Sequence, residues 1–376
     1  MRKSSFYCII VLLLPVFVFS QADSLYRPIS ASCVPGISSN GFPGTNVTTN
    51  FSFNVLGGIN RNLVGFEIGS LANVNAGSMT GLQIAGITNF TGGNVKGVQI
   101  AGVNNFVLGD VSVTHLAGVF NFALGNVNGA QTAGVFNIAV GHVAGIQLAG
   151  VLNLAVGGAE GAQVSGPLNI SIGDVPLQLG VTNIETGGTF TQLGVANIAG
   201  RSSGLQLGVF NFAAKQEGVP IGIVSVAGDG WYHVTLWADE TAPVSVGFKM
   251  GSKYIYNIYT YGYNPLGDTK HSRFGLGLGT RIPLDPFYVD IDAIHYQMNE
   301  GVSPWASNNG YNGLSEVRFM AGLSVMPGLR IFAGPTLNVW NSAQFDGETI
   351  PSFGLFLGDY DGQNFYTDIW LGFSLG

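Results

Sequence analysis

The sequence has 376 residues and a formal net charge of −7, and only 9% of its residues are charged, against about 25% in an ordinary soluble domain. The modest acidic charge argues against nucleic-acid binding, which selects for basic patches. Glycine contributes 57 residues, roughly double the usual share. A chain this poor in charge needs apolar surroundings for part of its surface if it is exported.

Residues 1–20 have the pattern of a secretory signal peptide. Basic residues at the start are followed by an apolar stretch that is too short to span a bilayer as a helix. Cleavage near residue 20 would remove Cys8 and leave Cys33, so no internal disulfide is expected. Residues 21–50 are rich in Ser, Pro, Gly and Asn and are expected to form an extended segment.

Residues 51–228 repeat one short phrase, with a step of 16 residues up to Asn169 and of 14 residues afterwards. Such a period means that one supersecondary unit is copied in series. A Gln column runs through Gln83, Gln99, Gln131, Gln147, Gln163, Gln178, Gln192 and Gln206, with Glu67 and His115 in the same slot. An Asn column runs through Asn73, Asn89, Asn105, Asn121, Asn137, Asn153, Asn169, Asn183, Asn197 and Asn211.

Within one unit, apolar residues alternate with small or polar ones. Between Ile146 and Val156 one set holds Ile, Leu and Val, and the other holds Gln, Ala and Asn. This period of two predicts a β-strand with one apolar face, and its length suits the about 9–11 residues of a transmembrane strand. Nearly all charges of the repeats fall in the turn-like segments between phrases. Lipid is therefore the expected solvent for the apolar face.

Two architectures fit this pattern. The leading one is an antiparallel transmembrane β-barrel of roughly 18–22 strands, with one strand per phrase. In that register Gln83 would face Asn105 on the lumen wall. Asn89 would face Gln99, and Gln99 would also face Asn121. The alternative is a β-solenoid of parallel coils followed by a small C-terminal barrel, in which Gln and Asn stack as ladders. The 14-residue units lack the alanine before the glycine, and such a deletion is more natural at a solenoid corner than inside a strand.

Residues 229–376 continue the β pattern without a linker. Stretches such as 273–281 and 316–325 alternate apolar residues with polar or small ones, which is typical of an outer-membrane barrel wall. The charged residues predicted to face inward are Arg273, Arg281, Asp290, Asp292, Glu316, Arg318, Arg330 and Asp368.

Four of these charged residues lie two apart on the same face of a strand: Asp290 with Asp292, and Glu316 with Arg318. We expect them to brace the lumen as an internal salt-bridge cluster. The competing interpretation is the pair of carboxylates of a hydrolase, which must be held at a defined separation around a substrate.

Other motifs with a chemical role are not found in the sequence. The five histidines show no metal-ligand spacing, and Gly-rich stretches such as 275–279 lack the strand–helix context of a nucleotide site. The sequence therefore predicts no catalytic residue, no cofactor and no metal, and the protein is not expected to be an enzyme.

The segment GLQLGVFNFA at 204–213 matches the repeat Gly-Φ-Gln-Φ-Gly-Φ-Φ-Asn-Φ-Ala position by position, where Φ is apolar. Residues 65–227 thus resemble a bacterial surface-repeat family, and residues 219–376 resemble Gram-negative outer-membrane β-barrels. These resemblances imply an exported protein of the cell outer membrane, in contact with outer-membrane lipid. Its expected role is structural or that of a passive pore for small solutes. The alternative is a surface-exposed repeat protein acting in adhesion or partner binding.

Overall fold

The computed structural model describes residues 24–42, 44–265, 270–300, 311–326, 328–342, 355–361 and 366–375. These residues form strands β1 to β35 and one 3-10 turn, η2 (Gly44–Asn46), without an α-helix. The expected all-β class is therefore confirmed. No helix in the described ranges is long and apolar enough to cross a membrane. The predicted signal peptide lies outside the described residues.

The chain divides into two compact units, residues 1–157 and 158–376. The strands of the first unit are β1 (Leu25–Tyr26), β2 (Ile29–Val34), β3 (Ile37–Ser38), β4 (Val47–Asn54), β5 (Gly57–Asn60), β6 (Asn62–Gly69), β7 (Ala72–Asn75), β8 (Met79–Ala85), β9 (Thr88–Thr91), β10 (Val95–Ala101), β11 (Asn104–Val107), β12 (Val111–Ala117), β13 (Phe120–Ala123), β14 (Val127–Ala133), β15 (Phe136–Ala139), β16 (Val143–Ala149) and β17 (Leu152–Ala155).

The second unit first continues the repeats and then forms a separate sheet. Its repeat strands are β18 (Ala162–Ser165), β19 (Leu168–Ser171), β20 (Val175–Leu179), β21 (Thr182–Glu185), β22 (Gly188–Leu193), β23 (Ala196–Leu207), β24 (Phe210–Gln216), β25 (Val219–Ile221) and β26 (Val224–Ala227). The strands of the separate sheet are β27 (Trp231–Trp237), β28 (Val244–Gly251), β29 (Ile255–Asn264), β30 (His271–Leu284), β31 (Phe287–Glu300), β32 (Asn312–Met326), β33 (Leu329–Ser342), β34 (Leu355–Asp361) and β35 (Tyr366–Leu375).

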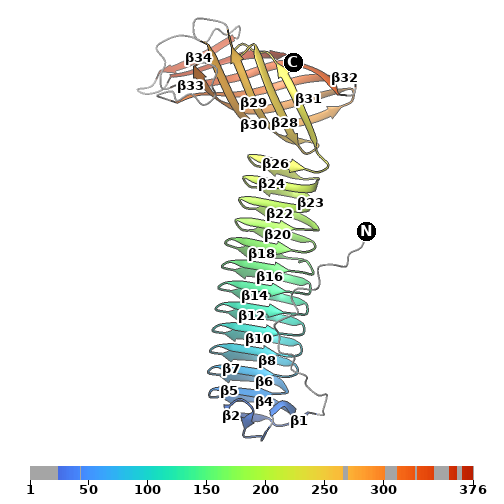
Figure 1. Cartoon of the computed structure of the whole chain (residues 1–376), viewed down its shortest axis with the longest axis vertical. Coiled ribbons are helices and arrows are strands. Elements are labelled where there is room, and N and C mark those ends of the chain that lie inside the picture. Colours follow the sequence, from blue (N-terminus) through green and yellow to red (C-terminus); the bar gives the residue numbers. More distant parts are fainter. Residues whose placement is uncertain are drawn as a thin grey trace. The chain divides into compact units, whose positions relative to one another are not determined.

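Each repeat of the first unit forms one turn of a β-solenoid, visible as the stacked coils coloured blue to green in Figure 1. A longer strand with the Gln column and a shorter strand with the Asn column are joined by a two-residue corner, which is Gly–Val in most of these coils. β10 pairs in parallel and in register with β8, which places Gln99 beside Gln83. β11 pairs with β9 in the same way, which places Asn105 beside Asn89.

The predicted antiparallel barrel is therefore wrong for the repeats. Gln83 does not face Asn105, and Gln99 faces neither Asn89 nor Asn121. Each amide instead meets the copy of itself in the next coil, which is the ladder arrangement that the solenoid alternative predicted.

The alternating run that suggested one long strand holds two short strands and a corner. β16 ends at Ala149, the corner is Gly150–Val151, and β17 begins at Leu152. Gln147 and Asn153 are nevertheless both buried, because the chain turns around one shared interior. Parallel stacking is favoured because identical amide side chains in register can bond to one another along the axis.

The shorter coils of the second unit keep the same interior. β23 ends at Leu207, and the corner Gly208–Val209 follows directly, so the alanine missing from these units is lost next to a corner. Gln206 and Asn211 both face inward, with exposures of 0% and 1%. A solenoid corner thus absorbs the deletion that a single barrel strand would need a bulge to absorb.

The expected extended segment at 21–50 also contributes to the coils. β2 pairs in parallel with β4, with Ile29 beside Phe51, and β3 turns back antiparallel to β2. This short hairpin lies against the first coil and protects part of its edge, which an exposed solenoid end requires.

The separate sheet of the second unit is antiparallel, in the order β27-β28-β29-β30-β31-β32-β33-β35-β34. It is curled (Figure 1), and His233 Nε2 on β27 meets Arg330 Nη1 on β33 at 2.5 Å across its inner side. Among the described residues no pairing joins the edge strands β27 and β34, so a curled sheet stands where a barrel was expected.

Candidate functional site

The interior of the coils is filled by two ladders of amide side chains. In the Gln ladder, Gln99 Nε2 donates to Gln83 Oε1 at 2.5 Å. In the Asn ladder, Asn89 Nδ2 donates to Asn105 Oδ1, and Asn105 Nδ2 donates to Asn121 Oδ1, each at 2.9 Å. All five of these predicted lumen residues are fully buried. They line a packed solenoid interior instead of the wall of a barrel lumen.

The two ladders run in opposite directions along the coils. Gln amides donate toward the N-terminal coil, and Asn amides donate toward the C-terminal coil. The second hydrogen of each Asn amide also finds an acceptor, as when Asn105 Nδ2 donates to Leu116 O at 2.8 Å. Buried amides are costly unless they are paired, so this pairing is what allows a polar interior.

Glu67 ends the Gln ladder at its N-terminal side. Gln83 Nε2 donates to Glu67 Oε2 at 2.8 Å, and Asn75 Nδ2 donates to the same oxygen at 2.9 Å. Asn54 and Asn60 each donate to Oε1 at 2.9 Å. Burial raises the pKa of Glu67 above its usual value, and the hydrogen bonds from its amide neighbours partly offset this shift. A carboxylate suits the position because it only accepts hydrogen bonds.

His115 interrupts the Gln ladder. Both of its ring nitrogens are buried without a hydrogen-bond partner, as are Gln99 Oε1 and Gln131 Nε2 in the coils on either side. The ladder resumes where Gln147 Nε2 donates to Gln131 Oε1 at 2.9 Å. Burial lowers the pKa of His115 to about 3, so the ring is neutral at physiological pH.

Replacing His115 with glutamine is expected to stabilise the coils by about 1–3 kcal/mol, because the new amide can pair with both Gln99 and Gln131. A histidine whose folded pKa lies below its unfolded value of 6.5 destabilises the fold as pH falls below 6.5. The gain from His115→Gln should therefore be larger at pH 5 than at pH 7. Urea unfolding of both chains at both pH values measures this gain. A urea midpoint of His115→Gln that is equal to or below that of the wild type would contradict the proposed gap in the ladder.

A third ladder runs along the loop edge of the coils and was missed in the sequence. Asp110 N donates to Asn94 Oδ1 at 2.9 Å, and Asn126 N donates to Asp110 Oδ1 at 2.8 Å. His142 N continues it by donating to Asn126 Oδ1 at 2.9 Å. The sequence carries the signal as short polar residues at the 16-residue step, within the turn-like segments between the phrases.

Glu185 is a second buried carboxyl of the coils. Its Oε2 accepts a hydrogen bond from Gly200 N at 3.2 Å, whereas its Oε1 has no partner. Burial raises the pKa of Glu185 to about 7, and the nearby Asp174 carboxylate adds to the shift. The coil interior therefore favours the neutral acid at this position.

Glu185→Gln should change how the stability of the coils depends on pH. The pKa of Glu185 in the folded state exceeds its unfolded value of 4.5. The fold therefore loses stability as the pH rises from 4.5 to about 7. The Glu185→Gln variant has no such loss. The amount by which its unfolding temperature exceeds that of the wild-type chain should therefore be greater at pH 8 than at pH 5. An advantage that is equal at both values would show that Glu185 ionises as freely in the fold as in the unfolded chain.

The inner side of the curled sheet holds a cluster of paired charges. Lys249 Nζ lies 3.0 Å from both Asp290 Oδ2 and Asp292 Oδ2. Arg318 Nη2 lies 2.8 Å from Asp292 Oδ2, and its Nε lies 3.6 Å from Glu316 Oε1. The four residues that the sequence predicts as a salt-bridge cluster thus do belong to one cluster.

Sequence reasoning missed two members of this inner network. Lys249 was not selected, although it alternates with small residues on the inner face of β28. Asp239, in the loop after β27, forms an ion pair with Arg273 and could not be placed without the fold. Asp290 is also held by Arg281 Nε at 2.7 Å. Each of these carboxylates is thus matched by a cation, which is the arrangement of a bracing cluster.

The outer side of the same sheet is mostly apolar. Val234 and Leu236 on β27 are 71% and 67% exposed. Phe248, Leu276 and Phe319 point outward on β28, β30 and β32. The charged side chains that the structure describes in β27–β33 are Lys249, Arg273, Arg281, Asp290, Asp292, Glu316, Arg318 and Arg330, all on the inner side. The sheet therefore has charges inside and hydrocarbon outside.

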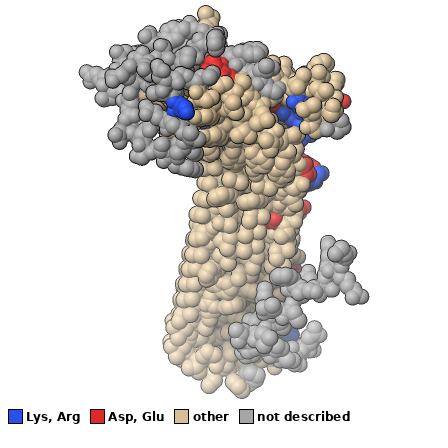
Figure 2. Space-filling view, turned by 45° about the horizontal axis from the view of Figure 1, so that its top comes forward, with Lys and Arg blue, Asp and Glu red and all other residues tan. Residues whose placement is uncertain are grey.

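The coils have the same inverted distribution. Ile146 and Leu148 flank the buried Gln147 and are 44% and 39% exposed. Apart from the buried Glu67 and Glu185, the described charges of the coils lie near the edge opposite the Gly–Val corner. In the view of Figure 2, the coil surface accordingly shows few charged side chains.

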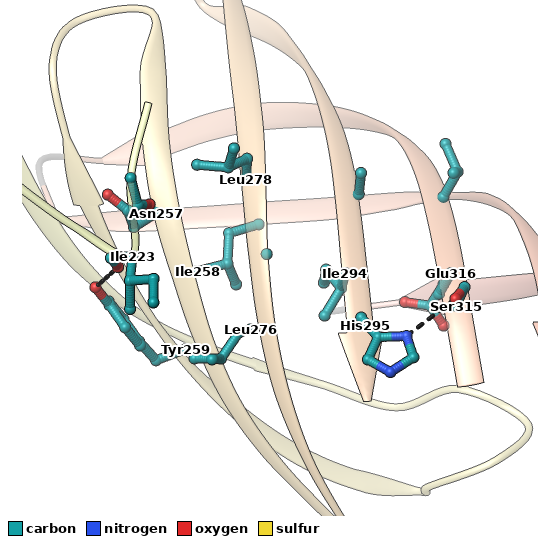
Figure 3. Close-up of a pocket in the computed structure, with 14 residues that line it drawn as sticks. Ile223, Asn257, Ile258, Tyr259, Leu276, Leu278, Ile294, His295, Ser315 and Glu316 are labelled. Carbon is teal, nitrogen blue, oxygen red and sulfur yellow. Dashed lines mark hydrogen bonds between the residues drawn. The ribbon is translucent and has the colours of Figure 1, made fainter. Parts of the chain in front are cut away.

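A pocket lies in the second unit, between the last coil and the outer side of the sheet (Figure 3). Asn257 Nδ2 donates to Gly222 O at 2.6 Å, and Tyr259 OH donates to Ile223 O at 2.5 Å. At the far side of the pocket, His295 Nδ1 lies 3.0 Å from Ser315 Oγ.

The pair of His295 and Ser315 invites comparison with a nucleophile and its base. The two residues are cross-strand neighbours on β31 and β32. The other ring nitrogen of His295 lies 3.2 Å from Tyr311 OH, where a catalytic triad has a carboxylate.

Among the described residues, no group of three or more His, Cys, Asp and Glu side chains is arranged to hold a metal ion.

Comparison of the chain with protein-family models, with curated proteins and with solved structures found no match.

Proposed function

We propose that this chain is an exported envelope protein whose curled sheet contacts membrane lipid and whose coils form a rigid repeat module. The observation that carries the proposal is the inverted sheet of β27–β33. The described Lys, Arg, Asp and Glu side chains of these strands point inward, and most of the outward side chains are apolar. This distribution suits an outer-membrane protein, which has an apolar band outside and polar groups inside.

The energetics favour lipid over water around this sheet. A soluble monomer rarely exposes an apolar patch of more than a few hundred Å². Here outward residues on several neighbouring strands, including Val234, Val246 and Phe319, are exposed together. Transfer of one apolar side chain from water to hydrocarbon is favourable by roughly 1.5–3 kcal/mol. Contact with membrane lipid would therefore stabilise this surface relative to contact with water.

The packed inner side supports a structural anchor more than an open pore. Arg273, Asp292 and Arg318 are almost completely buried, and Arg318 lies over the ring of Trp237 at 4.5 Å. Asn338 Nδ2 reaches Glu240 Oε1 at 2.9 Å across the curl. Side chains that fill the inside in this way leave little room for solutes.

The anchor is tested on the full chain, produced with its own N-terminal region in a Gram-negative host. Membranes are collected and washed with concentrated urea at high pH, which removes peripheral proteins. The proposal expects the chain to stay in the membrane pellet and to be released by detergent. Release by the wash would overturn it.

Two other roles give different outcomes in simple assays. A passive pore would make planar bilayers conduct, whereas the anchor proposal expects sealed bilayers. Adhesion through the coils is favoured by their regular outer faces, where side chains such as Ile146 and Leu148 are exposed among the described residues. That role requires the coils to be displayed, so protease added to intact cells should then remove residues 51–228.

A further inference from the structure

A continuous apolar groove lies in the second unit, and no role described so far uses it. One part follows the Gly–Val corners of the last coils and includes Val195, Val209 and Ile223. The other part lies on the outer side of the sheet, where Leu276 joins the lining. The two parts meet because both are lined by Ile223 and Leu278.

The walls of this groove offer hydrocarbon. Ile223 is 55% exposed and Leu276 is 41% exposed. The carbonyls of Gly222 and Ile223 already accept hydrogen bonds from Asn257 and Tyr259. An extended peptide would bury unpaired N–H and C=O groups here, whereas a hydrocarbon chain has none to satisfy.

One end of the groove is polar. His295 and Ser315 contact each other there, and Tyr311 OH lies 3.2 Å from His295 Nε2. Glu316 also lines the pocket, but its carboxylate accepts a hydrogen bond from Tyr296 OH at 3.2 Å on the inner side. The hydroxyl and ring N–H groups at this end can therefore donate hydrogen bonds to ester or hydroxyl oxygens of a ligand (Figure 3).

We propose that the groove binds one acyl chain of a membrane phospholipid, with the ester region of the lipid at His295 and Ser315. The inference rests on the proposed function, because the groove opens onto the outer side of the sheet that we place in lipid. A hydrocarbon chain matches the apolar walls, and the oxygens of an ester group match the hydrogen-bond donors at the polar end. The lipid would fill the angle between the last coil and the sheet.

The experiment uses the full chain in non-ionic detergent micelles, with palmitoyl-oleoyl-phosphatidylethanolamine as the probe. Native mass spectrometry counts the lipid retained per chain as its concentration is raised. The expected result is saturation at one lipid per chain. Ile223→Trp and Leu278→Trp fill the two walls and should each weaken binding by about tenfold or more.

Val119→Trp is the matched control, because Val119 stands at the same corner position in a coil of the first unit and should leave binding unchanged. Circular dichroism of each variant verifies that it is folded. Equal binding by all three variants, or retention that rises with lipid concentration without saturating, would overturn the proposal. A covalently crosslinkable dimer that excludes lipid from the groove would do the same.

The urea wash of membranes separates this inference from the proposed function. If only the groove proposal fails, the chain stays in the washed pellet but shows no saturable lipid binding. If the anchor proposal fails, the wild-type chain is released by the wash, whatever the groove binds in micelles.

Discussion

Replacing Asn137 with leucine is expected to lower the free energy of unfolding of the coils by about 3–5 kcal/mol. Asn137 Nδ2 donates to Asn153 Oδ1 at 3.0 Å and to Leu148 O at 2.7 Å. Its own oxygen accepts from Asn121 Nδ2 at 3.0 Å. Leucine removes these three buried hydrogen bonds, and each polar group left short of a partner costs about 1–3 kcal/mol. The shift of the urea midpoint, followed by circular dichroism, measures the loss.

Asn128→Leu is the matched control, because it is the same change at an exposed position on the neighbouring strand β14. It should alter stability by no more than about 0.5 kcal/mol. Equal effects of the two substitutions would mean that the amide ladder does not hold the coils together.

Replacing Asp292 with leucine should destabilise the curled sheet by about 3–5 kcal/mol, because it takes the nearest carboxylate from the buried Arg318 and one of two carboxylates from Lys249. The carboxylate receives Lys249 Nζ at 3.0 Å and Arg318 Nη2 at 2.8 Å. It also accepts a hydrogen bond from Tyr256 OH at 2.6 Å. Thermal unfolding in detergent, followed by near-ultraviolet circular dichroism, measures the effect.

The double variant Asp292→Leu with Arg318→Met distinguishes the effect of losing the ion pair from the effect of altered side-chain packing. Removing both partners relieves the unpaired charge, so the double variant should be more stable than Asp292→Leu alone. If the double variant were destabilised by the sum of the two single-variant effects, the cluster would stabilise the sheet through packing and not through charge.

The sequence was most informative about which face of each element is polar. Gln147 and Asn153 were placed on the polar set of their unit, and both are buried. Asp290 and Asp292 were placed on the inner side of the C-terminal strands, where they share Lys249. Alternation determines the face of a strand because successive side chains point to opposite sides.

Strand direction was the main error, and its cause is physical. A run such as 146–156 alternates equally well as one transmembrane strand or as two short strands around a corner. The corner at Gly150 and Val151 keeps the alternation intact, so the pattern alone cannot reveal it. The 14-residue units carried the better signal, since the loss of the alanine before Gly208 is more easily tolerated where the chain turns than inside a strand.

Other parts depend on contacts between distant residues. The partners of Asp239 and Lys249 lie on strands far along the chain, on β30 and β31. The gap around His115 was hidden as well, because a histidine in the Gln column looks like an ordinary substitution. Only the geometry shows that its ring reaches neither Gln99 nor Gln131.

The most direct test of the central claim is lipid contact at single positions of β27. In a Cys33→Ser background, one cysteine is placed at Leu236 on the outer side or at Thr235 on the inner side. Each is labelled with an environment-sensitive fluorophore in liposomes that contain spin-labelled lipid. We predict strong quenching at position 236 and little at position 235. Equal quenching at both positions, or none at 236, would contradict a lipid-facing sheet.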